Sequence, residues 1–276
     1  MEDKMQGNNP VFSRTEGFSG RQAGIDLAAP RADQLEDMYA APSATPVQTG
    51  RLTYDDVTMK TGITFGVLLV GAVVGWQLPQ LAFVGLIVGL VLGLVNAFKR
   101  EPNPPLILAY AAFEGLFVGG ISFFFENMQV GTRADGTAIT GDGIVAQAVL
   151  ATLAVFAVSL WAYRSKKIRV TPRFRRGVMI ALIGYLVFCL VNLLFQVFGS
   201  SDSPFGFRQG LFGILIGLFA VGLAAFCLIL DFDFIEQGVR NGLPARFAWT
   251  AAFGLTVTLV WLYVELLRLL AILRGE

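Results

Sequence analysis

The stretch LILDFDFIEQGVRNGLPARFAWTAAFGLTVTLVWLYVELLRLLAIL, residues 228–273, decides the fold. It begins as the end of an apolar helix, which we expect to end at Asp231 and Asp233, and continues through a short polar turn. A second apolar run follows and carries Glu265 well inside it. Burying a charge in hydrocarbon costs from about 3 to more than about 10 kcal/mol, so an acid inside a membrane span is a candidate functional residue by default.

The composition is that of a membrane protein. Hydrophobic residues make up 55% of the 276 residues and charged residues only 15%, against roughly 25% in soluble domains. The mean hydropathy is +0.64. A net charge of +1 gives no reason to expect a nucleic-acid partner, and the absence of histidine excludes histidine triads and HExxH zinc sites. No cofactor and no enzymatic activity are expected. Cys189 and Cys227 lie in apolar runs and are predicted to be free thiols.

From about residue 57 onward, seven apolar segments approach the roughly 20 residues that a helix needs to cross a bilayer. Proline punctuates them, with Pro79 ending the first helix and Pro105 suited to the first turn of the third. No alternation of apolar and polar residues with a period of two appears in this region. We therefore predict an all-α polytopic membrane protein, a bundle of seven transmembrane helices at residues 57–76, 81–98, 105–125, 143–163, 177–198, 211–230 and 247–273.

The chain changes character near residue 50. Residues 1–50 are rich in Gly, Pro, Ser, Asn and Gln, and are predicted to be a disordered, polar cytoplasmic tail, with residues 51–276 forming the transmembrane domain. Lysine and arginine concentrate in the tail and in every second connection, most of all in residues 164–176. The positive-inside rule then predicts a multi-pass protein of the plasma membrane, with its N-terminus in the cytoplasm and its C-terminus outside.

Small and amide side chains within the spans are predicted to join the helices. Glycines one turn apart let helix backbones approach closely, and asparagines form hydrogen bonds between helices. These residues are Gly62, Gly66, Gly85, Gly89, Gly93, Asn96, Asn192, Gly213 and Gly217.

Two acids stand out inside the spans. Glu114 lies near the midplane of the third span and has no cation nearby in sequence. A buried carboxylate without a partner readily takes up a proton, which is what a pH sensor needs. Glu265 lies in the outer third of the seventh span with Arg268 on the same helix face, so a local ion pair competes there with a functional role.

Three stretches carry a resemblance to a known family. ILAYAAFEGLFVGGIS (residues 107–122), LILDFDFIEQG (228–238) and LTVTLVWLYVELLRLLAIL (255–273) resemble the Bax inhibitor-1, or YccA-like, family. The start NPVFSR (9–14) and the long tail resemble bacterial members of actinobacterial type. The resemblance implies a bundle with the seventh helix central. It also implies a pH-sensitive calcium leak, in which one aspartate ending helix six and one within helix seven share a proton and control a cytoplasmic latch.

Only one of these two aspartates is present here. Asp231 matches the helix-six aspartate, and the helix-seven position falls on Thr258, which cannot ionise. Glu265 comes 7 positions later, about 10 Å further out on the same helix face. The resemblance then implies a single-aspartate latch, with Asp231 facing Thr258 or a cytoplasmic arginine, or pH sensing through Glu114. Asp233 and Arg240, at the cytoplasmic face, are the other latch candidates.

Two functions fit these residues. The first is a calcium leak in the lipid bilayer, with the oxygens of Glu114 and Asp231 as candidate ligands for the hard cation. The alternative is a non-conducting regulator of another membrane protein, such as a membrane-bound protease, acting through the tail and the basic connection. An intramembrane aspartyl protease is disfavoured because its usual GxGD signature is absent.

Overall fold

The computed structural model describes residues 49–132, 137–198 and 206–275. The chain divides into two units, Met1–Ala44 and Thr45–Glu276, and the described residues all belong to the second. The predicted tail, residues 1–50, thus falls almost entirely outside the described residues, and its disorder stays a prediction.

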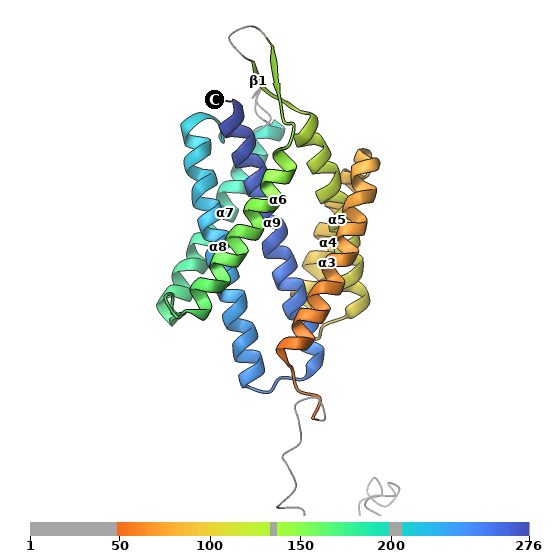
Figure 1. Ribbon diagram of the computed structural model, residues 1–276, viewed down its shortest axis with the longest axis vertical. Coiled ribbons are helices and arrows are strands. Elements are labelled where there is room, and N and C mark those ends of the chain that lie inside the picture. The colour runs from red at the N-terminus through yellow and green to blue at the C-terminus, as the bar shows by residue number, and fades with distance from the viewer. Residues whose placement is uncertain (1–48, 133–136, 199–205, 276) are drawn as a thin grey trace, which may run out of the picture. The chain divides into compact units, whose positions relative to one another are not determined.

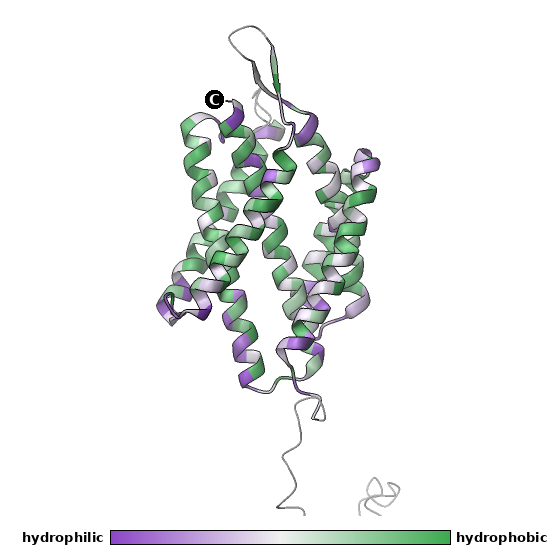
Figure 2. Cartoon of the chain, viewed as in Figure 1, coloured by the Kyte–Doolittle hydropathy of each residue, from purple (hydrophilic) through white to green (hydrophobic). Residues whose placement is uncertain are grey.

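Seven helices in the described part of the chain are long and apolar enough to cross a membrane, which confirms the predicted fold class. Figure 2 shows them apolar along their middles and polar toward their ends. They are α3 (Tyr54–Gln77), α4 (Ala82–Phe98), α5 (Pro104–Asn127), α6 (Ile144–Arg164), α7 (Pro172–Phe198), α8 (Gly210–Arg240) and α9 (Ala248–Gly275), with short 3-10 turns at Pro79–Leu81 and Ala245–Phe247.

Local sequence sets where several helices begin. Thr53 and Asp56 form a capping box at the start of α3, in which each side chain accepts a hydrogen bond from the other's backbone N–H. Asn103 caps α5 through the N–H of Leu106, with Pro104 at the first helical position.

The last helix, α9, lies at the centre of the bundle, as predicted. In its most apolar window 67% of the residues are buried, against 17% in α3 and 11% in the span that contains α4. Figure 1 shows α9 running between α3, α4 and α5 on one side and α6, α7 and α8 on the other. It contacts α3, α5, α6 and α8. Substitutions on α9 should therefore disturb more of the fold than substitutions on any other span.

Glycine allows close packing of the α3–α5 group, although at partly different positions from those predicted. A β-carbon on Gly71 of α3 would lie 2.5 Å from the carbonyl oxygen of Ala112, and one on Gly85 of α4 would lie 2.6 Å from that of Phe113. Gly62 and Gly66, by contrast, face open space, so the prediction that they bring helices together is wrong. The contact of α3 with α5 instead uses glycines such as Gly71, which lie one to three turns further along α3.

The two ends of the bundle differ, and we name them for their features. The basic end contains the start of α3 and the Lys- and Arg-rich connection between α6 and α7. Leu52, just before α3, donates its N–H to Leu243 O in the α8–α9 connection at 2.7 Å. The hairpin end contains β1 (Gln129–Thr132), β2 (Ala138–Thr140) and the end of α9, where Arg274 donates a 2.6 Å hydrogen bond to Asp142 O.

Two elements differ from the predictions. The antiparallel β1–β2 hairpin was not expected, because its strands are only 4 and 3 residues long. The sixth transmembrane helix does not end at Asp231 and Asp233 but continues to Arg240. It ends instead where Gly242 adopts a φ of +63° and Leu243 N–H bonds to Gly238 O at 3.0 Å, a Schellman motif. Asp231 is therefore inside a helix and faces the bundle.

Candidate functional site

The candidate site at the basic half of the bundle is centred on Asp231 of α8. The hydroxyl of Thr258, on α9, donates a 2.7 Å hydrogen bond to Oδ2 of Asp231. The same hydroxyl lies 3.1 Å from Gly254 O, one turn earlier on α9. A β-carbon added to Gly254 would lie 3.9 Å from Oδ1 of Asp231, an ordinary van der Waals contact, so this position does not require glycine. The structure thus places the aspartate opposite a neutral hydroxyl, which cannot share a proton as a second carboxylate would.

A cavity of about 290 Å³ opens beside this pair. Its polar lining consists of Asp231, Thr250, Asn96 and Lys99, and aromatic and aliphatic side chains complete its walls. Asn96 joins α4 to α5 as predicted, since its amide donates to Leu106 O at 3.2 Å. Oxygen ligands from α8, α9 and α4 therefore face one space, together with one lysine whose charge repels cations.

Glu114 lies in the contact between α5 and α4. Its Oε2 would lie 2.9 Å from a β-carbon on Gly89, so the carboxylate packs directly against the α4 backbone. The described residues give it no hydrogen bond and no ion pair. It does not line the cavity beside Asp231, but Ile107 does, and Glu114 follows Ile107 by 7 positions on the same face of α5, about 10 Å further along.

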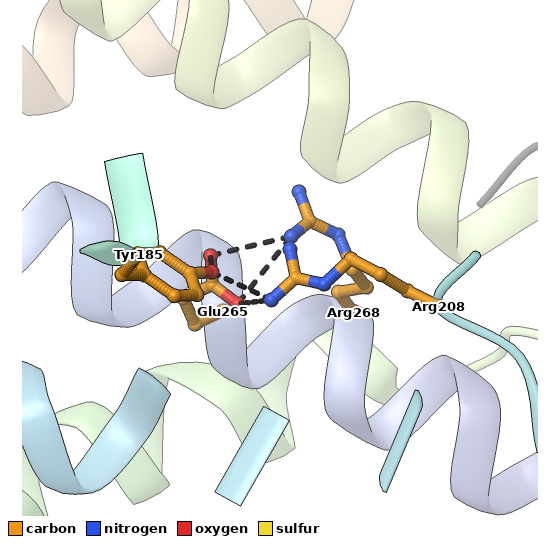
Figure 3. A network of polar contacts seen from close by, with 4 residues as sticks. All are labelled: Tyr185, Arg208, Glu265 and Arg268. Carbon is orange, nitrogen blue, oxygen red and sulfur yellow. Dashed lines mark hydrogen bonds and ion pairs between the residues drawn. The ribbon is translucent and has the colours of Figure 1, made fainter. Parts of the chain in front are cut away.

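Glu265 belongs to a second, separate cluster toward the hairpin end (Figure 3). Its carboxylate accepts hydrogen bonds from Tyr185 at 2.5 Å and from Arg208 at 2.9 Å. Arg268 lies 3.2 Å away, so the local ion pair, one of the two alternatives that the sequence left open for Glu265, is present. This pair is only one part of the cluster, because Arg208 also bonds to Glu265. Arg208 is almost completely buried, with 3% of its surface exposed.

The remaining candidates lie apart from both clusters. Asp233 forms an ion pair with Arg175 at 2.9 Å. Arg240 is mostly exposed and lies 3.9 Å from Glu236. Neither Asp233 nor Arg240 lines the cavity beside Asp231. No group of three or more His, Cys, Asp or Glu side chains able to hold a metal occurs in the described ranges, and Cys189 and Cys227 are free thiols.

Arg208 is the residue that sequence reasoning missed. Hydropathy places Arg208 in the connection before the sixth span, yet its side chain is buried in the bundle just before α8 begins. The available signal was Glu265 itself, since an acid buried among apolar residues requires a partner with opposite charge or several hydrogen-bond donors.

Comparison with protein families agrees with the resemblance found in the sequence. A family model described as Bax inhibitor 1 like matches residues 9–275, which is nearly the whole chain. No curated protein matches the sequence. The match spans all seven helices, including the α8–α9 segment that carries Asp231 and Thr258. The chain therefore belongs to the Bax inhibitor 1 like family of multi-pass membrane proteins.

Proposed function

We propose that the protein is a cation leak, with calcium as the conducted ion, whose conductance depends on the protonation of Asp231. The observation that carries the proposal is the position of Asp231, which accepts a hydrogen bond from Thr258 and lies on the wall of a cavity between α4, α5, α8 and α9. Calcium prefers several oxygen ligands in flexible arrangements, and the carboxylate, the Thr250 hydroxyl and the Asn96 carbonyl supply such oxygens.

The path toward the hairpin end follows α5. Ile107 lines the cavity and Glu114 lies on the same helix face about 10 Å further along, so Glu114 is the next acid that a cation entering from the basic end would meet. Conduction requires sites that attract an ion but also release it. Two separate acids at different depths meet this requirement better than a closed cage of ligands would.

We propose that the protein lies in the plasma membrane and that its basic end faces the cytoplasm. The start of α3 and the connections that carry Lys99, Arg169 and Arg246 lie at this end. Cytoplasmic connections carry an excess of lysine and arginine, so the positive-inside rule supports a cytoplasmic N-terminus and an external C-terminus. The cavity beside Asp231 then opens toward the cytoplasm.

The test is calcium flux into liposomes that contain the purified full-length protein and a trapped calcium indicator. The wild-type flux is expected to vary between about pH 6 and 8, because protonation removes the charge that attracts the ion. Asp231→Asn should abolish this dependence, and Glu114→Gln should lower the flux. Asp233→Asn is the matched control, since Asp233 lies two residues from Asp231 on the same helix but outside the cavity.

Equal calcium flux in the wild type, Asp231→Asn and Glu114→Gln between about pH 6 and 8 would contradict the leak. Absence of flux in every liposome sample, together with a specific partner crosslinked in native membranes, would favour the alternative role as a regulator of another membrane protein.

A further inference from the structure

A second cavity, of about 510 Å³, lies between α7 and α9 toward the hairpin end. This volume is within the range of about 300 to 1,000 Å³ that is typical of small-molecule sites. Tyr185, Arg208, Glu265 and Arg268, the four residues drawn in Figure 3, all line it. The cavity beside Asp231 has none of these residues in its lining, so the two cavities are separate features.

The charged side chains of this cluster do not balance. Arg208 and Arg268 each carry a positive charge, and Glu265 is the one acid among the described residues that line the cavity. Side-chain exposure is 4% for both Arg208 and Glu265, and 25% for Arg268. A net positive charge at this depth of an apolar bundle is costly unless an anion compensates it.

Among the described residues, both guanidinium groups also retain hydrogen-bond donors without a partner. An arginine has five N–H groups. Arg208 donates through Nη2 to Tyr185 and Glu265, and its buried Nε has no partner. Arg268 reaches Glu265 only through Nη1, at 3.2 and 3.4 Å. The Glu265 carboxylate already accepts from three side chains, so an additional acceptor has to come from outside the cluster.

The rest of the lining is apolar and reaches the membrane-facing surface. Leu182, Trp261 and Val264 cover the inner part, and Leu186 and Leu193, both more than half exposed, lie at the edge of α7. Asn192 adds a polar side chain at the hairpin end of the cavity, where its Oδ1 accepts from the N–H of Phe207 at 2.9 Å. The cavity therefore has a cationic region at one part and a surface suited to hydrocarbon at another.

We propose that this cavity binds an oxyanion, a phosphate or carboxylate group, at Arg208 and Arg268. An anionic amphiphile of the membrane is the ligand that uses the whole lining, with its acidic headgroup at the two arginines and its chain along the leucines of α7. A small oxyanion from the aqueous phase has the same headgroup chemistry and would occupy only the cationic part. This site is independent of the proposed calcium leak.

The test uses the full-length protein in nanodiscs of a neutral phosphatidylcholine, with or without phosphatidylglycerol. Native mass spectrometry is expected to show phosphatidylglycerol retained by the wild type after the bulk lipid is removed. A second arm adds inorganic phosphate to protein in the neutral lipid and measures the thermal unfolding midpoint. Retention of the anionic lipid identifies an amphiphile, and stabilisation by phosphate alone identifies an aqueous anion; both support an oxyanion site.

Arg268→Gln is the decisive variant, because it removes the excess charge and leaves the ion pair of Arg208 with Glu265. Its affinity for the anion should fall about tenfold or more, since charge-assisted hydrogen bonds are lost. Arg268→Lys should retain part of the binding. Arg274→Gln, at the same end of the bundle but outside the cavity, is the matched control and should bind like the wild type.

A cavity-filling variant keeps the proposal open to refutation if Arg268→Gln does not fold. Leu186→Trp leaves every charge in place and occupies the apolar part, so it should reduce binding of phosphatidylglycerol and spare that of phosphate. Equal retention of neutral and anionic lipids by the wild type, with no stabilisation by phosphate, would overturn the proposal. So would unchanged binding in a folded Arg268→Gln protein.

Discussion

Asp231 and Thr258 lie 27 positions apart in the chain, yet the threonine hydroxyl donates a 2.7 Å hydrogen bond to the aspartate carboxylate. This bond joins α8 to the central helix α9, at the position where the family resemblance implies two carboxylates. A hydroxyl can donate to an acid in either protonation state, but it cannot take the proton. Any switch at this position thus depends on a single ionisable group.

Replacing Thr258 with valine keeps the side-chain shape and removes the hydroxyl. Asp231 then loses its one hydrogen-bond partner among the described side chains, and we expect the free energy of unfolding to fall by about 1–3 kcal/mol. Circular dichroism during thermal unfolding in detergent measures this, with Thr258→Ser as the control that retains the bond. A valine variant as stable as the wild type would show that the bond contributes little.

Lys99 is predicted to limit cation entry, because its positive charge lies in the same cavity as Asp231. Lys99→Met should raise calcium flux in the liposome assay severalfold, and the effect should weaken as salt increases. Arg100→Met provides the comparison, since Arg100 is the next residue and does not line the cavity. Similar effects of the two substitutions would indicate a general surface-charge effect.

The ion pair of Arg208 with Glu265 should contribute strongly to stability only while both charges are present. Arg208→Met leaves a buried carboxylate with less compensation and should cost about 3 kcal/mol of unfolding free energy. Adding Glu265→Leu should recover part of that loss, with a coupling energy above about 1 kcal/mol in a double-mutant cycle.

The pair of Arg240 with Glu236 is the comparison for this cycle, because it is exposed and its atoms are 3.9 Å apart. Its coupling energy should stay below about 0.5 kcal/mol. Equal coupling in the two pairs would mean that burial does not strengthen the interaction of Arg208 with Glu265.

Gly71→Ala should destabilise the contact of α3 with α5. The added β-carbon would lie 2.5 Å from Ala112 O and 3.1 Å from the α-carbon of Gly115, so the helices have to separate, at a cost of about 1–3 kcal/mol. Gly62→Ala adds the same atom to the same helix in open space and should be neutral or slightly stabilising. The difference between their unfolding free energies isolates the packing effect.

Membrane orientation can be tested with single cysteines in a background that lacks Cys189 and Cys227. Ala138→Cys, on the hairpin, should react with a membrane-impermeant maleimide in intact cells, since we propose that this end faces outside. Ser165→Cys, in the connection between α6 and α7, should react only after the membrane is permeabilised. The reverse pattern would invert the proposed topology.

Much of the fold follows from local properties that the sequence displays directly. Seven apolar runs of bilayer length predict seven helices, because a backbone in hydrocarbon has to satisfy its hydrogen bonds internally. The family motif correctly predicts the central position of α9. The ion pair of Glu265 with Arg268 was also predictable, because residues three apart meet on one helix face.

Other features were decided only by tertiary contacts. The acids at Asp231 and Asp233 looked like a helix end, but Thr258 and Arg175, both distant in sequence, provide the partners that let α8 continue. Gly62 and Gly71 lie on the same helix, and the path of α5 determines which of the two needs to lack a side chain. Arg208 reads as a surface cation until the fold brings it to Glu265. Sequence thus determined which segments cross the membrane, since that depends on the hydropathy of each segment alone. The tertiary structure decided which charges meet, since that depends on how the helices pack.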